Sequence, residues 1–533
     1  MSHAIVVNDL RFAWPEGDLL FDGLSFTVGP GRTGLVGVNA SGKSTLFRLL
    51  TGELAPQGGS IRTEGRAGYL RQDLTLDASL PIDEVLGVAG VRQALAAIER
   101  GDVDEGHFAA VGDDWDVDER ARAMLDRLGL AHVDLDRRVG DMSGGEAVLL
   151  GLAAQFLRRP DVLLLDEPTN NLDLTARRRL YDAVASWSGV MLIVSHDREL
   201  LEQVDTIAEL RAGRVRSYGG NFTAYEQAVA LQQESAERAV RVAEADVRRQ
   251  QRELIENQIK QSRGERYGKK SFENTRRPRA AMRALKRTAQ ANAAKQRNLH
   301  TGKLDEARER LTTAEDAVRD DDVIAVDLPE TAVPAGRTVL RVEEAELRNG
   351  AAVDLELRGP EQVALLGGNG SGKTTLLETI TGRLDPHAGT VRPTVPMRYL
   401  PQRLTVLDDA ETIVENVARL APAATVQAIR SRLARFQFRG DRADQIVGTL
   451  SGGERFRATL AALMLAEPAP QLLLLDEPTN NLDIASAEQL SQALAAYEGA
   501  LIVASHDVRF LRTLGITRWL QLDGTLTEID PPD

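Results

Sequence analysis

The chain has 533 residues, 43% of them hydrophobic and 27% charged, and a formal net charge of −14 at pH 7. This length exceeds a single core, since a domain usually takes roughly 100 to 200 residues. The chain holds no cysteine, which excludes disulfides, thiolate zinc sites and iron–sulfur clusters. It has no apolar run near the roughly 20 residues that span a bilayer, and Met1–Ala4 lacks the features of a signal peptide. We therefore expect a cytoplasmic protein.

A set of short motifs occurs twice in the same order, which indicates a tandem duplication. We expect one cassette at residues 1–224, a linker at 225–320, a connector at 321–337 and a second cassette at 338–533. The paired motifs are Gly37–Ser44 with Gly367–Thr374, Ser143–Glu146 with Ser451–Glu454, Asp166–Asp173 with Asp476–Asp483, and Ser195–Asp197 with Ser505–Asp507.

The first half carries an insertion. Lys43 precedes Asp166 by 123 residues, whereas Lys373 precedes Asp476 by 103 residues. The surplus lies at about residues 85–120, in a helical subdomain, and most of its charges are acidic. Because acidic surfaces repel phosphates, we expect a solvated elaboration rather than a phosphate-contacting face.

The first motif predicts a phosphate-binding loop between a strand and a helix. In such a loop the backbone N–H groups and the helix N-terminus surround the β-phosphate. The lysine reaches the β and γ oxygens, and the following Ser or Thr ligates Mg²⁺. The residues expected to bind nucleotide are Gly37, Asn39, Gly42, Lys43, Ser44 and Thr45, and Gly367, Asn369, Gly370, Gly372, Lys373, Thr374 and Thr375.

Continuous apolar runs at 162–165 and 472–475 predict buried parallel strands, each ending in an Asp-Glu pair. The aspartates of these pairs suit Mg²⁺ through water, and the glutamates are placed to act as general bases on the attacking water. The aspartates are Asp166 and Asp476, and the glutamates are Glu167 and Glu477.

A further apolar strand in each half ends at a histidine, His196 or His506. Each histidine follows the aspartate of its half by 30 residues. A histidine at this place can donate a hydrogen bond to the γ-phosphate, whereas a single histidine at a strand end is more often structural. The repetition favours the functional interpretation.

Phosphate loop, Tyr-Leu-x-Gln strand end, Ser-Gly-Gly signature, Asp-Glu pair, Asn-Leu-Asp turn and histidine, in this order, resemble the ABC-type ATPase cassette. The resemblance implies an α/β fold with two P-loop cassettes, each with a helical subdomain, facing head to tail. It implies that each of two ATP molecules lies between one phosphate loop and the opposite signature, within a monomer. It assigns catalytic and Mg²⁺-linked roles to Gln72 and Gln402, and nucleotide contacts to Trp14, Ser143, Gly144, Gly145, Ser451, Gly452 and Gly453.

Three features depart from the usual cassette pattern. Ala40 stands where the family usually has glycine, at a position that often needs a positive φ. Both signatures end in glutamate rather than glutamine. Trp14 supplies a ring for adenine stacking, but residues 347–350 of the second half offer none. Nucleotide affinity is therefore expected to differ between the sites.

The linker shows two weak heptad stripes, at 236–254 and 304–318, in which apolar residues recur every three or four positions. Folded back on each other, they predict an antiparallel α-helical hairpin. Two helices lying separately on the cassettes are the alternative.

The linker tip, residues 260–303, contains 14 Lys or Arg residues and two Glu residues, a net charge of +12 that leaves −26 for the remainder. Such a basic segment favours a polyanion, because neutralising phosphates is the main source of sequence-independent nucleic-acid affinity. A solvated charged face is the alternative. The residues expected to contact RNA are Arg263, Arg266, Lys269, Lys270, Arg276, Arg277, Arg279, Arg283, Lys286 and Arg287.

Tandem cassettes, an Asp-Glu-Pro-Thr-Asn-x-Leu-Asp motif in each and a charged helical linker resemble the ABC-F family of translation factors and ribosome-protection proteins. The segment Tyr218–Tyr225 is similar to that family's entry into its linker. The resemblance implies binding of the ATP-closed state in the tRNA exit region of the ribosome, with ribosomal RNA and tRNA as partners. General translation factor and antibiotic-resistance protein both stay open.

Two other classes of ATPase share parts of this pattern. The ATPase subunit of a transporter with separate membrane subunits would share the cassettes, but it has no evident use for a basic hairpin between them. A DNA-repair or chromosome-structure ATPase would have a much longer coiled coil.

Overall fold

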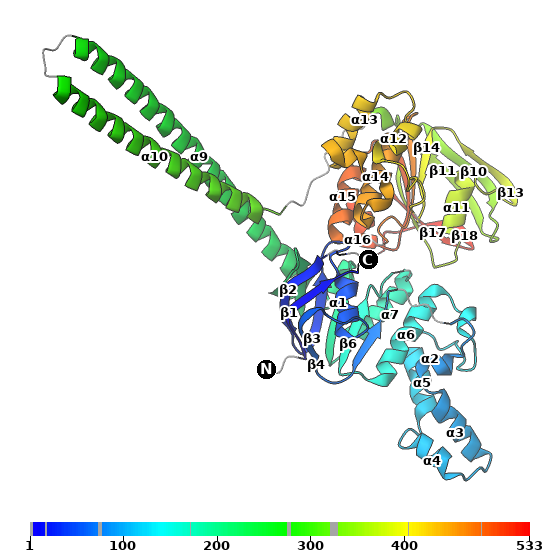
Figure 1. The fold of residues 1–533 in the computed structure, drawn as a ribbon. Helices are drawn as coiled ribbons and strands as arrows, with labels where there is room; N and C mark the ends of the chain where they lie inside the picture. The colour runs from blue at the N-terminus through cyan, green and yellow to red at the C-terminus, as the bar shows by residue number, and fades with distance from the viewer. Residues whose placement is uncertain are drawn as a thin grey trace. The chain divides into compact units, whose positions relative to one another are not determined.

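The computed structural model describes residues 4–15, 17, 19–72, 77–170, 172–273, 279–319, 329–402, 404–480 and 482–532. The chain divides into two compact units. One unit comprises both cassettes, Met1–Phe222 and Asp322–Asp533, and the other is Thr223–Asp321. Figure 1 labels the elements of both units.

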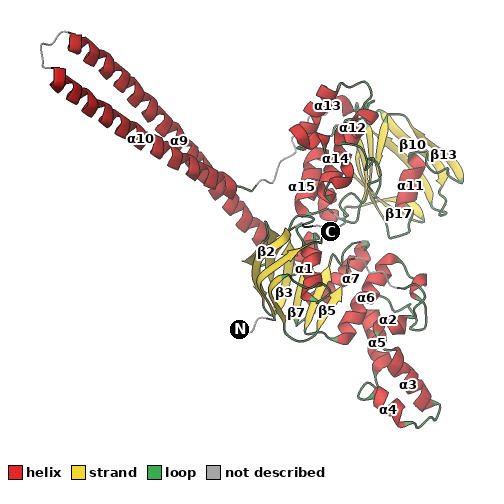
Figure 2. Ribbon diagram, in the orientation of Figure 1, coloured by secondary structure: helices red, strands yellow, loops and turns green. Residues whose placement is uncertain are grey.

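The first cassette has two sheets, one antiparallel and one mainly parallel (Figure 2). The antiparallel sheet has the order β2-β1-β4, and the other has the order β5-β6-β7-β3-β8-β9. Their strands are β1 (Ile5–Ala13), β2 (Leu19–Val28), β3 (Gly31–Val36), β4 (Gly58–Thr63), β5 (Ala67–Leu70), β6 (Val162–Asp166), β7 (Val190–Val194), β8 (Thr206–Arg211) and β9 (Arg214–Gly219).

The second cassette repeats this plan in one continuous sheet of order β13-β10-β11-β18-β17-β12-β16-β15-β14. Its strands are β10 (Thr338–Glu346), β11 (Ala352–Arg358), β12 (Gln362–Leu366), β13 (Ala388–Pro393), β14 (Met397–Leu400), β15 (Leu472–Asp476), β16 (Ala500–Ala504), β17 (Arg518–Asp523) and β18 (Thr525–Ile529).

The apolar runs before the Asp-Glu pairs form interior strands of these sheets, each next to an edge strand. β6 and β15 are buried at every residue, and so are the neighbouring strands β7 and β16. β6 pairs in parallel with β5 and β7, and β15 pairs in parallel with β14 and β16. The prediction of buried parallel strands and of an α/β fold is confirmed. Because parallel strands end at the same edge, the motifs that follow them come together there.

The helices around the first sheet are short, and the insertion falls among them. After α1 (Lys43–Leu50), the subdomain runs through α2 (Ile82–Leu86), α3 (Ala89–Glu99), α4 (Glu105–Val111), α5 (Val117–Arg127) and α6 (Gly144–Arg158), before α7 (Leu174–Ala185) and α8 (Arg198–Leu201). Arg92 of α3 joins three carboxylates, Asp83 at 2.5 Å and Asp118 and Asp136 at 2.9 Å. An arginine shared by three aspartates fixes α3 to its neighbours.

The second cassette has the corresponding helices without α3 and α4. These are α11 (Lys373–Ile380), α12 (Ile413–Leu420), α13 (Val426–Leu433), α14 (Gly452–Met464), α15 (Ile484–Ala495) and α16 (Val508–Thr513).

The other unit contains two long helices, α9 (Phe222–Glu273) and α10 (Arg279–Ala317). Val247 packs against Leu304 and Ala307, with Leu254 and Leu311 beside them. Asp246 is 3.0 Å from Arg310, and Asn257 is 2.7 Å from His300. Since low numbers in α9 meet high numbers in α10, the helices run antiparallel, and their contacts come from both predicted stripes. Arg276 and Arg277 of the basic tip lie outside the described residues.

Both cassettes contain the same bulge in their first strand, in β1 where it pairs with β4 and in β10 where it pairs with β13. Asp9 and Glu344 have positive φ angles of 47°, and the pairing register shifts around each of them. The partner strand brings a glycine against this bend, Gly59 or Gly389. A Cβ at Gly389 would lie 2.2 Å from the Glu344 carbonyl oxygen, and its φ is +80°. Only glycine satisfies both conditions.

We expect Gly389→Ala to destabilise the second cassette by about 3 kcal/mol or more, because a steric clash adds to the cost of left-handed backbone. Gly382→Ala is the matched control, since Gly382 has φ +71° but open space around a Cβ. It should cost only about 1 kcal/mol. Thermal unfolding of both variants checks this, and equal midpoints would contradict it.

Candidate active sites

Two cavities lie at the carboxyl edges of the two sheets. The first pocket, of about 460 Å³, contains Trp14, Asn39, Ala40, Gly42, Lys43, Ser44, Thr45, Gln72, Asp166, Glu167, Asn170, His196 and, from the second cassette, Gly452. The second pocket, of about 390 Å³, contains Asn369, Gly370, Gly372, Lys373, Thr374, Thr375, Gln402, Asp476, Glu477, Asn480, His506 and, from the first cassette, Gly144, Gly145 and Leu172. Residues widely separated in sequence are thus brought together twice.

Each phosphate loop folds around its own lysine. Lys43 Nζ donates to the carbonyl oxygens of Gly37 at 2.7 Å and Val38 at 3.1 Å. Lys373 Nζ does the same with Gly367 and Gly368, at 2.7 and 3.2 Å. Both lysines are buried, which lowers the pKa of their ammonium groups, while the nearby carboxylates act in the opposite direction. The loop therefore presents a positive charge to its pocket.

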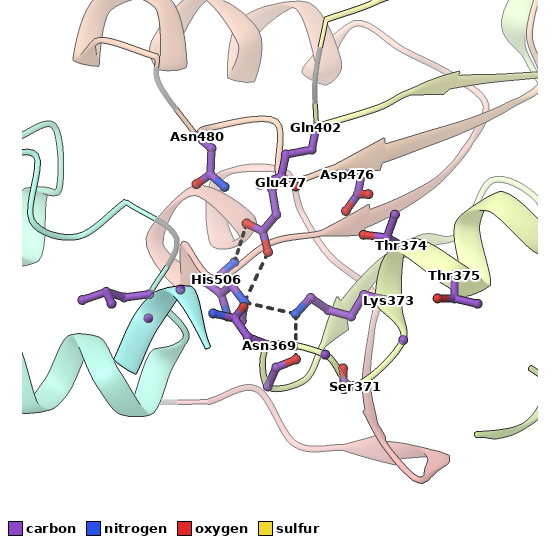
Figure 3. Close-up of a pocket in the computed structure, with 16 residues that line it drawn as sticks. Asn369, Ser371, Lys373, Thr374, Thr375, Gln402, Asp476, Glu477, Asn480 and His506 are labelled. Carbon is purple, nitrogen blue, oxygen red and sulfur yellow. Dashed lines mark hydrogen bonds and ion pairs between the residues drawn. The ribbon is translucent and has the colours of Figure 1, made fainter. Parts of the chain in front are cut away.

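The histidine and the glutamate of each pocket lie in contact. Figure 3 shows Lys373, His506 and Glu477 pointing toward one another in the second pocket. His506 Nε2 is 3.1 Å from Lys373 Nζ and 3.4 Å from Glu477 Oε1. In the first pocket, His196 Nε2 is 3.3 Å from Glu167 Oε1. The aspartate and the histidine of each half, which are 30 residues apart in sequence, thus lie at the ends of neighbouring strands, β6 and β7 or β15 and β16.

Burial sets the protonation of these groups. It lowers the pKa of His196 and of His506 to about 3, so both rings are neutral at neutral pH. The His–Glu contacts are therefore not ion pairs, and His506 Nε2 accepts from the Lys373 ammonium. Burial also raises the pKa of Glu477 to about 7, and it raises that of Glu167. A carboxylate that titrates near neutral pH is matched to general-base work.

The backbone at both glutamates is strained. Glu167 has φ 47° and Glu477 has φ 45°, in a region that non-glycine residues rarely occupy. Each is held there by its N–H, which donates at 2.8 Å to the last residue of the neighbouring strand, Val194 or Ala504. Strain that is held in place this way is typical of functional sites. No sequence pattern indicated it.

Both Asp-Glu aspartates are oriented by a tyrosine that sequence reasoning did not select. The Tyr69 hydroxyl donates to Asp166 at 3.2 Å, and the Tyr399 hydroxyl donates to Asp476 at 3.1 Å. The repeated Tyr-Leu-x-Gln strand ends contained the signal, but only the glutamine drew attention. Asn170 and Asn480, which line the pockets, were also missed although their motif repeats.

The chemistry of the donor set suits Mg²⁺. Asp476 accepts a hydrogen bond from the Thr374 hydroxyl, and Ser44 and Asp166 line the first pocket together. Among the described residues no group of three or more His, Cys, Asp or Glu residues could hold a metal ion. A hydroxyl and a carboxylate, completed by water and substrate phosphates, are what Mg²⁺ ordinarily takes.

The glutamate that ends each signature caps its own helix. Ser143 N donates to Glu146 Oε2 at 2.8 Å, and Glu146 N donates back to Ser143 Oγ at 3.3 Å. Ser451 and Glu454 form the same capping box at the start of α14. The departure from glutamine therefore keeps the helix N-terminus, with its glycine N–H groups, available at the pocket.

The phosphate loops differ at Ala40. It has φ 63°, and the corresponding Gly370 has φ 79°, so the position does require a positive φ and the first loop carries a strained alanine. The first loop also receives a contact from the other cassette, because Asn39 N donates to Asp483 Oδ2 at 2.7 Å.

Comparison with known proteins agrees with this class of site. The family model described as "ABC transporter" matches residues 21–170 and 351–480, once in each cassette. The solved structure "RNase-L Inhibitor" shares the fold, with a TM-score of 0.58 and 19% identity over 99% of this chain and 90% of its own. No helix within the described part of the chain is long and apolar enough to cross a membrane.

Relatives that match more than nine tenths of the chain are found in bacteria and plants. The probable ATP-binding protein YheS of Escherichia coli strain K12 is 33% identical, over 93% of this chain and 75% of its own. The tylosin resistance ATP-binding protein TlrC of Streptomyces fradiae is 33% identical, over 91% of both chains. ABC transporter F family member 5 of Arabidopsis thaliana is 30% identical, over 99% of this chain and 76% of its own. The chain belongs to the ABC-F family of tandem ATP-binding-cassette proteins.

The pockets differ in their aromatic lining. Trp14 borders the first pocket, is 37% exposed, and packs edge-on against Phe12 at 5.3 Å between ring centroids. The described residues that line the second pocket include no Trp, Tyr or Phe. Beside the phosphate loop of the second cassette lies Asn349 instead, whose side-chain amide donates to the Ser371 carbonyl oxygen at 2.9 Å.

We expect Trp14→Ala to weaken nucleotide binding at the first pocket several-fold, because loss of a stacking ring costs about 1 kcal/mol. A fluorescent ATP analogue measures each pocket when the lysine of the other is replaced, Lys373→Ala or Lys43→Ala. Trp115→Ala, at an exposed tryptophan of the insertion, is the control. An unchanged affinity at the first pocket would contradict adenine stacking on Trp14.

Proposed function

We propose that this ABC-F protein hydrolyses ATP at two composite sites and uses the closed, ATP-bound state to act on the ribosome, in its tRNA exit region. The action would modulate translation or protect the ribosome against antibiotics. The observation that carries the ATPase part is the lining of each pocket. A phosphate loop of one cassette lies with signature glycines of the other, Gly452 in the first pocket and Gly144 and Gly145 in the second.

The residues of each pocket divide the work of the reaction ATP + H₂O → ADP + phosphate. The lysine and the loop N–H groups hold the β- and γ-phosphates. The glutamate accepts a proton from the attacking water, and its raised pKa makes it a stronger base for that proton than an ordinary carboxylate. The neutral histidine can turn a ring N–H toward the γ-phosphate. Ser44 and Asp166 with Gln72, or Thr374 and Asp476 with Gln402, would hold Mg²⁺, which would neutralise phosphate charge.

The opposite signature closes the site. The N-termini of α6 and α14, capped by Ser143 and Ser451, each present backbone N–H groups and a partial positive charge. ATP bound to one phosphate loop would draw the opposite signature onto its γ-phosphate. Closure would then depend on ATP, and hydrolysis would reopen the pair.

The ribosomal part of the proposal is supported by the linker and by the relatives. The described members of the basic segment include Lys260, Arg263, Lys295 and Lys303, and all four side chains are exposed. TlrC, with 91% coverage of both chains, is named for tylosin resistance. Exposed cations on an antiparallel hairpin fit a surface of RNA phosphates.

The double variant Glu167→Gln with Glu477→Gln should bind ATP but hydrolyse it at least about 100-fold more slowly, because general-base catalysis supplies about 10²- to 10⁴-fold. The phosphate loops stay intact, so the closed state should accumulate. Phosphate release and retained nucleotide are measured together. The control is Glu105→Gln with Glu498→Gln, at two exposed glutamates. Hydrolysis at the parental rate by the Glu167→Gln with Glu477→Gln variant would refute the assignment of the base.

The same Glu167→Gln with Glu477→Gln double variant tests whether the ribosome is the partner. Ribosomes and membranes from cells that express it are separated by sedimentation, and the protein should travel with the ribosomes. A cryo-EM map should place it in the tRNA exit region with the linker tip on ribosomal RNA or tRNA. Recovery with membranes would favour the alternative of a transporter ATPase subunit.

Replacing Arg276, Arg277, Arg279 and Arg283 by Glu changes the charge of the tip by eight units and should weaken ribosome association by at least about tenfold, with a smaller dependence on salt. ATP hydrolysis without ribosomes should be unchanged. The control makes the same change at Arg238, Arg241, Arg248 and Arg252, which are exposed on α9 below the tip. Equal weakening by both sets would show that only net charge matters and would refute a specific role of the tip.

Drug susceptibility separates the two biological roles. If the protein protects against drugs of the peptidyl transferase centre, shortening the tip around 266–272 should abolish resistance and leave ribosome binding largely in place. If it is a general factor, its deletion should slow translation and leave susceptibility unchanged.

A further inference from the structure

One arginine of the first cassette bridges segments that belong to different pockets. Arg177 lies on α7, and its side chain is 13% exposed. Its Nε donates to the Leu172 carbonyl oxygen at 3.2 Å, and its Nη1 is 3.5 Å from Asp197 Oδ2. Leu172 lines the second pocket, whereas Asp197 directly follows His196 of the first pocket. Nothing in the nucleotide-binding motifs accounts for Arg177.

The carboxylate that holds Arg177 is itself fixed on several sides. The Tyr181 hydroxyl donates to Asp197 Oδ2 at 2.7 Å. Asp197 Oδ1 accepts the backbone N–H groups of Glu199 and Leu200 at 3.0 and 3.1 Å, which caps α8. Asp197 therefore stays in place without Arg177, and Arg177 uses it as an anchor.

The charge of Arg177 also acts on the second cassette. Burial disfavours the guanidinium charge, but Asp197, Tyr181, Asp507 and Glu477 offset this, and the pKa of Arg177 is raised. Asp507 and Glu477 belong to the second cassette. In turn, Arg177 opposes the burial that raises the pKa of Glu477. The guanidinium charge is thus close enough to the second pocket to influence Glu477, the proposed base of that pocket.

At the corresponding described positions, the second cassette lacks the two side chains that form this bridge. Counted from the aspartate of the Asn-Leu-Asp turn, Ala487 stands at the position of Arg177 and Ser491 at that of Tyr181. Alanine has no polar side-chain group, and the Ser491 hydroxyl donates to the Ala487 carbonyl oxygen of its own helix at 3.1 Å. Leu482, the counterpart of Leu172, therefore lacks this tie.

A second contact has the same one-sided character. Arg198, the residue after Asp197, forms an ion pair with Glu488 of the second cassette. At the corresponding place of the second cassette stands Val508, and the counterpart of Glu488 is Arg178. An ion pair is impossible between those two residues.

We propose that Arg177 is a positioning residue of the second nucleotide site, which holds the Leu172 backbone at that site by anchoring it to Asp197. Among the described residues, the Asn-Leu-Asp turn that the second cassette directs to the first site has no arginine in this role, so the two sites differ in how this turn is anchored. The loss of Arg177 should then affect catalysis at Lys373 and Glu477 and spare catalysis at Lys43 and Glu167. This inference rests on the proposed ATPase activity of both sites.

The test measures each site separately in the full chain. Glu167→Gln leaves the second site as the one with a base, and Glu477→Gln leaves the first. Adding Arg177→Ala should lower kcat of the second site on the order of tenfold, with KM within about twofold, because misplacement acts on the transition state. The first site should stay within about twofold. An equal fall at both sites, or an unchanged second site, would overturn the proposal.

Three variants separate positioning from a general loss of structure. Arg178→Ala removes the same charge from an exposed neighbouring position on α7 and should change neither site. Arg177→Lys keeps a cation for Asp197 and should recover part of the loss. Tyr181→Phe loosens the anchor while keeping its ring, and should lower kcat of the second site more than that of the first. A fall in the second site as large for Arg178→Ala as for Arg177→Ala would overturn the proposal.

A measurement without hydrolysis keeps the two proposals distinguishable. Amide hydrogen exchange of 172–181 should rise about tenfold in Arg177→Ala with a non-hydrolysable ATP analogue, while that of the corresponding 482–491 should not change. If neither single Gln background hydrolyses ATP, the proposed activity fails, and exchange alone decides on Arg177. Unchanged exchange at 172–181 would overturn the positioning role.

Discussion

A lysine ammonium buried beside two carboxylates, at the carboxyl edge of a parallel sheet, is the constraint on which each cassette is built. Lys43 and Lys373 are each only 7% exposed, and the nearest acceptor of each ammonium is a carbonyl oxygen of its own loop, that of Gly37 or Gly367. Burying a charge is costly unless it is paired and hydrogen-bonded. The loop supplies the hydrogen bonds, the Asp-Glu pair supplies the opposite charge, and a polyphosphate would complete the balance.

That constraint explains the state of the neighbouring groups. A histidine next to a buried ammonium stays neutral, because both burial and the lysine oppose its charge. Burial in the same enclosure raises the pKa of Glu477 to about 7. The strained backbone at Glu167 and Glu477 directs these carboxylates into the pocket rather than along the strand.

The cassettes repeat this centre but differ in what surrounds it. The first has Trp14, the strained Ala40 and the insertion that carries α3 and α4, and it also contributes Arg177. Two chemically similar sites therefore differ in residues outside the phosphate motifs. The charge distribution adds a second asymmetry, since the basic linker tip and the acidic remainder of the chain favour different partners.

The sequence by itself determined the duplication, the cassette fold, the phosphate loops, the Asp-Glu pairs and the repeated histidines. These features are local, because a buried strand followed by a glycine turn and a helix is encoded in a few adjacent residues. The heptad stripes of the linker likewise indicated its helices. Only the tertiary structure decided that Tyr69 holds Asp166, that Glu146 caps its own signature helix, and that Arg177 ties Leu172 to Asp197. Such contacts depend on how side chains on different strands and helices meet once the core is packed, and neither periodicity nor motif spacing specifies that.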